Sequence, residues 1–197
     1  MKTKPRCLLV SATAVAALFA LSVKADETAT NSAAAPPTVT NSTATAASEM
    51  PVVTNQITLK FVSVDSAETN GEDGKGPNAV DGNPNTFWHT QWQDASPEHP
   101  HEIIIELVPP STIKGFTYLP RQDGNENGTI KDYEFYVSDD GKDFGQPVKK
   151  GTFESGSDKK TVTFDPVKCR FIKLKALSEV NGEAWTSAAE IGVIPND

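Results

Sequence analysis

Short apolar runs separated by polar turns make up the chain from about residue 57 onward. Several runs alternate apolar and polar side chains, and no long stretch keeps a helical period. Clusters of Gly, Pro, Asn and Asp separate them, as in Asp139-Asp140-Gly141-Lys142. The pattern predicts strands at 57–64, 101–108, 112–120, 133–138, 161–165, 170–177 and 189–194. It indicates an all-β sandwich or jelly roll.

Two connections in this pattern are long, at about 67–100 and 120–131. Both are rich in Asn, Asp and Gly and also carry bulky ring or charged side chains. Long loops in a compact domain are often functional. We therefore expect the functional residues in these two loops.

The chain begins with the pattern of a secretory signal peptide at 1–25. Three basic residues precede an apolar run from Cys7 to Val23, and small residues lie at the exit, which ends at Ala25. A membrane anchor is disfavoured because Ser and Thr interrupt the run and no basic stop-transfer cluster follows it. No lipobox ends the run. We expect a protein that is secreted, or that stays at the cell surface or in the periplasm.

Residues 26–55 differ in composition from the rest. They are mostly Thr, Ala, Ser, Pro and Asn, with too few large apolar side chains to offset the entropy of ordering the chain. We predict a flexible tether here. The folded domain is then 56–197.

The net charge and the cysteine content limit which partners the protein can bind and how its fold can be stabilised. The chain has 18 basic and 26 acidic residues, with a formal net charge of −8. Binding to a phosphate backbone needs a basic face, so we expect no nucleic-acid partner. Cleavage after Ala25 would remove Cys7 and leave Cys169 alone, which excludes an intramolecular disulfide. Cys169 lies in an apolar run, and we expect it to be buried.

Residues 77–92, PNAVDGNPNTFWHTQW, are rich in carboxylate, amide and hydroxyl oxygens. Calcium takes six to eight oxygen ligands, many of them carbonyls presented by tight turns. The core of this segment, 81–85, is also an ordinary turn sequence. The loop alone therefore leaves a calcium site and a plain turn both open.

A binding site for a neutral sugar needs an aromatic plane and a few fixed hydrogen-bonding groups. The planar fork of Arg can bond two oxygens at once, and Asn offers a donor and an acceptor together. The candidates in the two long loops and near the last strand are His89, Trp92, Arg121, Asn125, Asn127 and Trp185.

Each main candidate also has a structural interpretation. His89 could cap a turn, and Arg121 could pair with Asp123 or Glu126 at the surface. Asn127 precedes Gly128 in a turn dipeptide. Trp185 could fill the end of the sandwich. His99 and His101, which flank a strand start, are interpreted as structural or solvated.

Two motifs resemble those of a known family. AVDGNPNTFWHT at 79–90 is similar to the A-x-D-G-x-x-x-T-x-W-x-[ST] motif of discoidin domains, the C-type domains of coagulation factors five and eight. SAAEIGVI at 187–194 resembles their final strand. The resemblance covers about 60–197. The His after the Trp and the Arg-to-Asn segment resemble family 32 carbohydrate-binding modules most.

The resemblance implies an all-β fold, an eight-stranded antiparallel β-sandwich with the jelly-roll topology of galactose-binding domains. It also implies one structural calcium ion and makes Trp88 a core residue. The ligands would be two carboxylates, one hydroxyl and three carbonyls, from Asp81, Glu190, Thr86, Asn78, Asn83 and Ala189.

The resemblance also implies the sugar ligands. Galactose-type modules use a loop His, a strand-end Arg, a nearby Asn and an aromatic residue of the last loop. These are His89, Arg121, Asn127 and Trp185 here. Apart from the resemblance, we expect Trp92 and Gln91 to extend the platform to a second sugar unit. The insert QDGNEN at 122–127 leaves Asn125 as an alternative to Asn127.

We therefore predict a secreted, non-catalytic carbohydrate-binding module that needs calcium. Its partners would be glycans of mucins or polysaccharides that end in galactose or N-acetylgalactosamine, and we expect a monomer. The alternative is a cell-surface adhesion domain that binds a protein. Insertion into a membrane is disfavoured because the loops are polar and the domain is acidic. Catalysis is disfavoured because no nucleophile elbow, zinc-protease motif or phosphate loop occurs in the sequence.

Overall fold

The computed structural model describes residues 56–196. The predicted signal peptide at 1–25 and the predicted tether at 26–55 lie outside the described residues. Within the described part, the regular structure is eight strands and one short 3-10 helix. In chain order the elements are β1 (Thr58–Val64), η1 (Gly76–Val80), β2 (Trp88–His89), β3 (His101–Leu119), β4 (Asp132–Ser138), β5 (Lys149–Thr152), β6 (Lys160–Ala176), β7 (Ser187–Ala188) and β8 (Glu190–Pro195).

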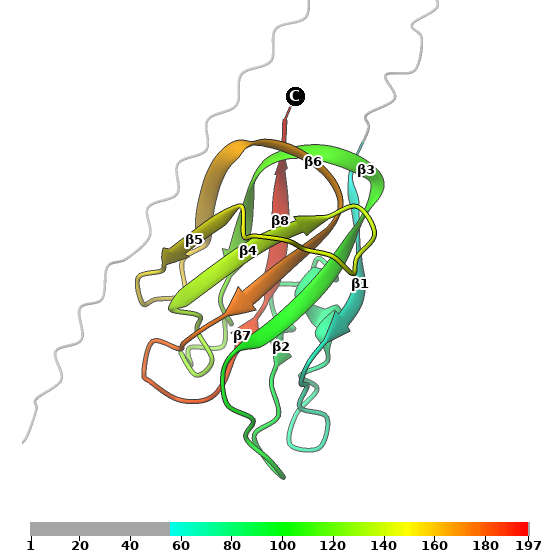
Figure 1. The fold of residues 1–197 in the computed structure, drawn as a ribbon. Helices are drawn as coiled ribbons and strands as arrows, with labels where there is room; N and C mark the ends of the chain where they lie inside the picture. The colour runs from blue at the N-terminus through cyan, green and yellow to red at the C-terminus, as the bar shows by residue number, and fades with distance from the viewer. Residues whose placement is uncertain (1–55, 197) are drawn as a thin grey trace, which may run out of the picture. The chain divides into compact units, whose positions relative to one another are not determined.

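Two long strands, β3 and β6, build both layers of the sandwich. The first part of β3 pairs with β1 on one side and with the last part of β6 on the other, and β4 and β5 continue this layer. The second part of β3 pairs with the first part of β6 and with β8 in the other layer. Figure 1 shows β3 and β6 arching over together at the top, with β8 behind β4. These pairings are antiparallel, which confirms the predicted fold class.

The sequence pattern predicts two separate strands in place of β3 and two in place of β6. In the structure 101–108 and 112–120 form one bent strand, as do 161–165 and 170–177. Irregular pairing between Glu106 and Ser111 accommodates the bend in β3, as bulges do in curved sheets. Pro109 and Pro110, which interrupt the apolar pattern, lie exposed at the bend. The short β2, β5 and β7 were not predicted, because two to four residues carry no periodic signal.

The core lies between the two layers and is rich in aromatic rings. Phe116 and Phe135 stack with centroids 4.1 Å apart, and Tyr133 and Phe153 stack at 4.2 Å. Burying a side chain of this size contributes roughly 1.5–3 kcal/mol each. Trp88 is 1% exposed and its indole N–H donates to the Ser66 carbonyl, which confirms it as a core residue. Cys169 is free and buried, as predicted.

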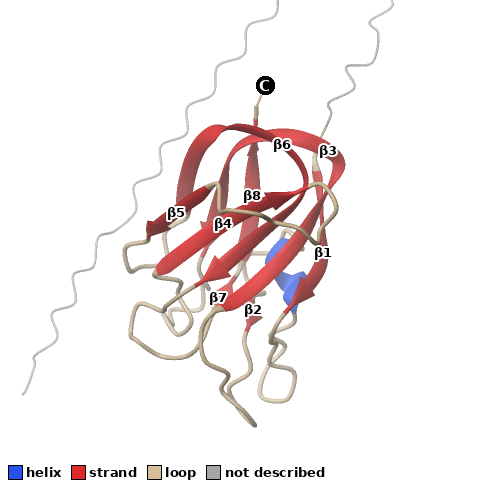
Figure 2. Ribbon diagram, in the orientation of Figure 1, coloured by secondary structure: helices blue, strands red, loops and turns tan. Residues whose placement is uncertain are grey.

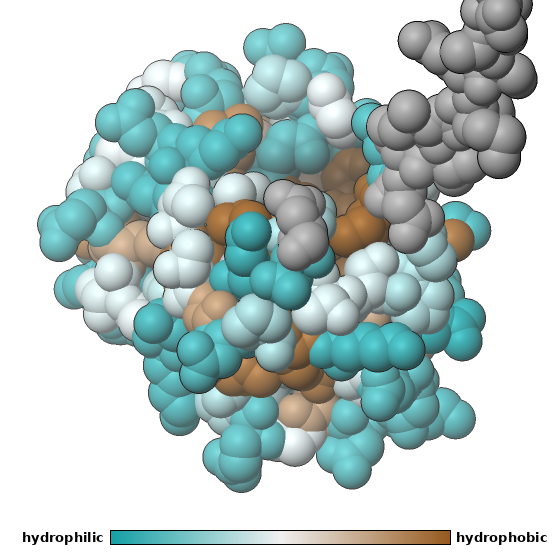
Figure 3. Space-filling model, turned by 90° about the horizontal axis from the view of Figure 1, so that it is seen from above, coloured by the Kyte–Doolittle hydropathy of each residue, from teal (hydrophilic) through white to brown (hydrophobic). Residues whose placement is uncertain are grey.

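Loops gather at one end of the sandwich, at the bottom of Figures 1 and 2, where β2 and β7 pair. The first and last described residues lie at the opposite end. That end is mostly hydrophilic, with apolar side chains showing between polar ones (Figure 3). Among residues 56–196 no helix has the length and apolar character needed to span a bilayer.

Candidate functional site

A cleft of about 360 Å³ opens among the loops at this end. Four separate segments contribute to it, namely the loop around Glu72, residues 89–92, residues 121–127 and the loop before β7. The cleft is lined by Glu72, His89, Trp92, Arg121, Asn125, Asn127 and Trp185. All five residues predicted to bind the sugar therefore line one cleft, together with the alternative Asn125 and with Glu72, which was not predicted. Their role as ligands remains a prediction.

His89 is held by strand pairing and by its own ring. It lies opposite Ser187 in the β2–β7 pair and is 2% exposed. The ring Nδ1 is 2.7 Å from the Thr90 carbonyl, which can only accept, so Nδ1 carries the proton. Burial lowers the pKa of His89, although the Thr90 carbonyl opposes this effect. Nδ1 thus bonds the backbone locally, as the structural interpretation expects, and Nε2 of the neutral ring is left as an acceptor.

Arg121 is 7% exposed and is oriented by two neighbours. Its Nε and Nη2 donate to the two carboxylate oxygens of Asp123, at 2.9 and 2.6 Å. Its guanidinium carbon lies 4.2 Å from the centroid of the Phe87 ring. The structure thus shows the pairing with Asp123, and this hydrogen bond lowers the pKa of Asp123. Arg121 nevertheless lines the cleft, with its Nη1 unpaired among the described residues.

Asn125 and Asn127 differ in what their side chains already bond. The Asn125 side-chain oxygen accepts from the Asn127 backbone N–H at 2.9 Å, so it supports the turn. The Asn127 side chain has no hydrogen-bond partner within the described part of the chain. Its backbone oxygen accepts from the Ser187 hydroxyl at 3.0 Å. This difference favours Asn127 over Asn125 as a group available to a ligand.

Gly128 allows the Asn127 loop to approach β7. It has a φ of 81°, and an added Cβ would lie 2.7 Å from the Ser187 nitrogen. The Ser187 N–H donates to the Gly128 carbonyl at 2.7 Å. A residue with a side chain would meet both strain and a clash at this position.

Two indole rings from different loops line the cleft. The Trp185 ring centroid is 6.3 Å from that of His89, and its Nε1 donates to the Ser96 hydroxyl at 3.1 Å. Trp92 is 39% exposed, and its Nε1 donates to Glu72 Oε1 at 2.9 Å. Both indole N–H groups are thus satisfied. The ring faces remain as apolar surfaces on which the C–H face of a sugar could stack.

Three carboxylates were missed by the sequence analysis. Glu72 lines the cleft, 3.8 Å from His89 Nδ1. Glu68 is 1% exposed and accepts five backbone N–H bonds, from 69–71 and from 92–93. Glu179 is 2% exposed and accepts from Gly128 and Glu183 N–H groups, among others. No motif indicates them. The available signal was their place in polar loops, which does not tell a buried acid from a solvated one.

The predicted metal loop forms a compact turn. Asp81 Oδ1 accepts from the Asn83 N–H at 2.8 Å, and Asp81 Oδ2 accepts from the Thr86 hydroxyl at 2.7 Å. The Thr86 hydroxyl also lies 2.9 Å from the Asn83 carbonyl oxygen. These three predicted ligands therefore lie together.

Glu190 approaches this turn from the start of β8. Burial, and then the Asp81 charge beside it, raise the pKa of Glu190. Its Oε1 is buried and has no hydrogen-bond partner among the described side chains and backbone. An unpartnered carboxylate oxygen beside a second carboxylate is costly without a cation. The pair therefore fits a positive ion that prefers oxygen ligands.

The other two predicted ligands bring only backbone oxygens. The Asn78 side chain is used to donate to the carbonyls of Asp73 and Phe87, at 2.7 and 3.2 Å. Ala189 is 0% exposed and bonds the Leu119 carbonyl through its N–H. Within 56–196 no group of three or more His, Cys, Asp or Glu side chains is placed to hold a metal. Any ion at this turn would depend on carbonyl oxygens, which suits calcium better than a transition metal.

Comparison with known proteins locates this geometry in a family. Residues 62–191 match the family model of the F5/8 type C domain. Galactose oxidase from Gibberella zeae is 41% identical over 133 residues, which cover 67% of this chain and 19% of that protein. A sialidase from Micromonospora viridifaciens is 39% identical over 140 residues, covering 71% and 22%. The chain thus spans about a fifth of the length of these curated relatives.

Solved structures give the same picture. A CBM32 module from Clostridium perfringens, in complex with GalNAc-β-1,3-galactose, has a TM-score of 0.64 at 36% identity, covering 70% of this chain and 95% of that one. The family 32 module of Clostridium perfringens NanJ, in complex with galactose, has a TM-score of 0.59 at 33% identity, covering 70% and 92%. The structural neighbours are family 32 carbohydrate-binding modules.

Proposed function

Since the chain belongs to the F5/8 type C domain family, we propose that its cleft binds neutral glycans ending in galactose or N-acetylgalactosamine. The observation that carries the proposal is the set of groups in one cleft. Two indole faces lie beside a neutral His acceptor, an Arg donor and an unpaired Asn amide. Two similar modules have been solved with galactose or with a GalNAc-galactose disaccharide.

The charges of the cleft support a neutral ligand. Asp123 neutralises Arg121 through a two-bond ion pair, and His89 is uncharged. Glu72 then adds a negative charge with no cationic side chain paired to it in the described structure. A carboxylated sugar would meet this charge without a compensating cation. Hydroxyl groups can donate to Glu72 and to His89 Nε2 and accept from Arg121.

We also propose that the domain is a non-catalytic, exported module that holds one calcium ion. Asp81 and Glu190 would supply carboxylates, Thr86 its hydroxyl, and Asn78, Asn83 and Ala189 their carbonyls. The unpartnered Glu190 oxygen supports this site. The ion would neutralise the two carboxylates and fasten the 81–86 turn to β8. Export rests on the signal-peptide pattern at 1–25.

The binding proposal is tested by titrating the full chain, with Ca²⁺ present, with galactosides and with a glycan array. We expect binding to terminal galactose or N-acetylgalactosamine and none to galacturonate. Arg121→Ala should weaken it by roughly tenfold to a hundredfold, because a charged hydrogen bond is lost.

Arg170→Ala is the matched control, since Arg170 pairs with Glu106 at 2.7 Å away from the cleft and should leave affinity unchanged. A folded chain that binds none of the glycans on the array would overturn the proposal. Protein adhesion would then take its place.

A further inference from the structure

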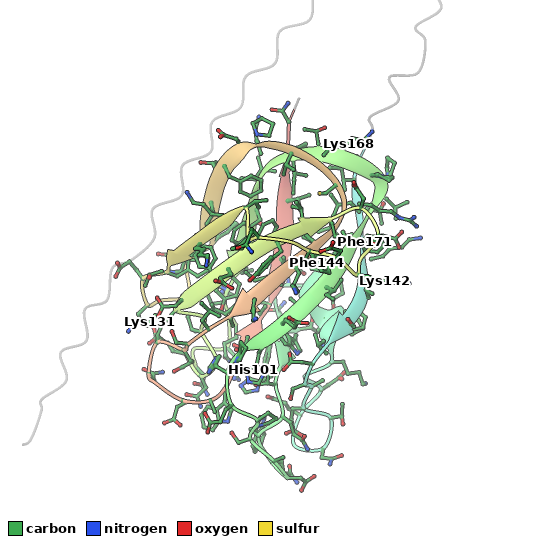
Figure 4. All side chains as sticks on the ribbon, viewed as in Figure 1. His101, Lys131, Lys142, Phe144, Lys168 and Phe171 are labelled. Carbon is green, nitrogen blue, oxygen red and sulfur yellow. The ribbon has the colours of Figure 1, made fainter. Side chains whose placement is uncertain are left out.

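His101 is a buried histidine outside the cleft, at the beginning of β3 and at the loop end of the molecule (Figure 4). It is 0% exposed. Its Nδ1 lies 2.7 Å from Asp65 Oδ2, and its Nε2 lies 2.8 Å from the Ala184 carbonyl oxygen. The carbonyl oxygen of Pro97 is 3.2 Å from the same Nε2.

All three partners of the His101 ring are hydrogen-bond acceptors, one at Nδ1 and two at Nε2. A neutral imidazole carries a single N–H, so one of its nitrogens would turn a lone pair toward an acceptor oxygen. The imidazolium has an N–H on each nitrogen and satisfies both sides. The contacts of His101 in this structure therefore correspond to the protonated ring.

The carbonyl groups that His101 contacts belong to residues next to Trp185 and next to its hydrogen-bond partner, Ser96. Ala184 directly precedes Trp185, and Pro97 directly follows Ser96, whose hydroxyl accepts from the Trp185 indole N–H. His101 thus joins the two segments that fix this indole. Asp65 anchors the ring to the end of β1 and also accepts from the Glu102 N–H at 2.7 Å.

We propose that the His101 imidazolium is a positioning residue that holds Trp185 in the cleft, so that sugar affinity falls when the ring loses its proton. The loss of the proton would break the bond to Ala184 or the one to Asp65. The Asp65 carboxylate is the stronger acceptor, so the 184–185 segment would be released. The sugar part of this inference rests on the proposed function.

The groups that face His101 support a protonated ring. Burial acts to lower its pKa, but the hydrogen bonds to Asp65 and Ala184 raise it above the ordinary value. The His99 ring lies 5.0 Å away, and burial and the His101 charge lower the pKa of His99, so it stays neutral. Its Nε2 contacts the Thr186 hydroxyl at 3.1 Å, and Glu98 and Asp65 are the nearby acids.

The raised pKa of His101 sets the direction in which the stability of the loop changes with pH. A raised pKa means that the ordered loop is stabilised fully below the ordinary value of about 6.5, and that this stabilisation is lost as pH rises through the raised value. His89 titrates on the opposite side, because its pKa is lowered. Its protonation would weaken binding only at lower pH. The two histidines therefore act in separate pH windows.

The first test needs no mutation. Nitrogen NMR of the His101 ring in the full chain, with Ca²⁺ present, should show both ring nitrogens protonated at about pH 6, and the midpoint should lie above about 6.5. The Trp185 indole N–H signal should broaden or move with the same midpoint. A neutral ring at about pH 6, or an indole signal that ignores the titration, would overturn the proposal.

The second test measures affinity for methyl β-galactoside between about pH 6 and pH 9. Each unit by which the sugar raises the His101 pKa should appear as a roughly tenfold fall in affinity across the midpoint. Asp65→Asn should move the midpoint to lower pH, and His101→Gln should bind weakly at every pH. Arg170→Ala is the control, because Arg170 pairs with Glu106 away from both histidines, and it should keep the wild-type profile. A pH-independent affinity in the wild type would contradict the inference. Absence of binding at every pH would instead contradict the proposed function. The titration of the Trp185 indole signal would then test the positioning role by itself.

Discussion

Three residues of the cleft use one part of the side chain for the fold and leave another part available to the proposed ligand. His89 bonds Thr90 through Nδ1, and Arg121 bonds Asp123 through Nε and Nη2. Trp185 bonds Ser96 through its indole nitrogen. Side chains that are fixed in this way lose little entropy on binding, so weak polar contacts can still add up to specific recognition.

The stacking plane should dominate the affinity at this scale. Trp185→Ala should cost on the order of 1–3 kcal/mol of binding free energy, because the apolar face of the sugar loses its aromatic contact. Isothermal titration with a monosaccharide measures the loss. Trp92→Ala is the comparison, and it should weaken a disaccharide more than a monosaccharide if Trp92 extends the platform. Wild-type affinity in Trp185→Ala would refute this assignment of the stacking ring.

The cleft is surrounded mainly by loops, and buried carboxylates hold these loops in place through hydrogen bonds to their backbone. Glu68 joins 69–71 to 92–93 through five backbone N–H groups. Glu179 joins Gly128 to the 181–183 turn. A carboxylate can accept several such bonds, so one side chain satisfies backbone donors that a sheet would otherwise pair.

Glu68→Gln should loosen the loops that carry Glu72 and Trp92. The amide has only one acceptor oxygen, so backbone donors at 69–71 or 92–93 lose their partner. Hydrogen exchange of the Trp92 and Gln93 amides should speed up, and sugar affinity should fall. Asp140→Asn is the control, since Asp140 orders the separate 140–143 turn. Unchanged exchange at Trp92 and Gln93 would show that the carboxylate is dispensable.

The same carboxylate predicts behaviour in acid. Its bonds to backbone N–H groups, that of Trp92 first, lower the pKa of Glu68 to about 2. Its stabilising contribution is therefore present above the ordinary value of about 4.3, and is lost as pH falls toward 2. Protection of the Trp92 and Gln93 amides, relative to their intrinsic exchange rates, should fall in this window in the wild type and change less in Glu68→Gln.

At the scale of the whole molecule, the described domain is held by packing, and we propose that a cation takes the place that disulfides have in other small domains. Its one described cysteine, Cys169, is free. The Asp81–Glu190 carboxylate pair joins the first long loop to the last strand. Without a positive ion, the negative charges of Asp81 and Glu190 would repel each other where the first long loop meets β8.

Calcium should therefore raise the thermal stability. At a free concentration a hundred times its Kd, the ion would stabilise the fold by about 2.7 kcal/mol, which is roughly 5–10 °C in Tm for a domain of this size. Calorimetry with Ca²⁺ and with a chelator measures the shift. Glu190→Gln should abolish most of it, while Glu106→Gln on the outer sheet should keep it. Equal Tm values with and without the ion would contradict the proposed site.

Several properties follow from the sequence alone, because they depend on local pattern. Alternation along the strands predicts the β-sandwich, since every second side chain must enter the core. The motif at 79–90 places Trp88 in the core and His89 next to it. The Asn127-Gly128 dipeptide predicts a turn, whereas the close approach of Gly128 to Ser187 is known only from the structure.

Tertiary structure alone decided which distant groups meet. Strand pairing between β2 and β7 brings His89 beside Trp185, and the bend of β3 merges two predicted strands into one. The partners of Glu68 and Glu179 lie in other loops. The pairing of His101 with Asp65, across 36 residues, is equally invisible in a local pattern. From sequence alone, a carboxylate or an imidazole is expected to be exposed to solvent. Its burial and its protonation depend on side chains and carbonyl groups that the fold brings together from distant parts of the chain.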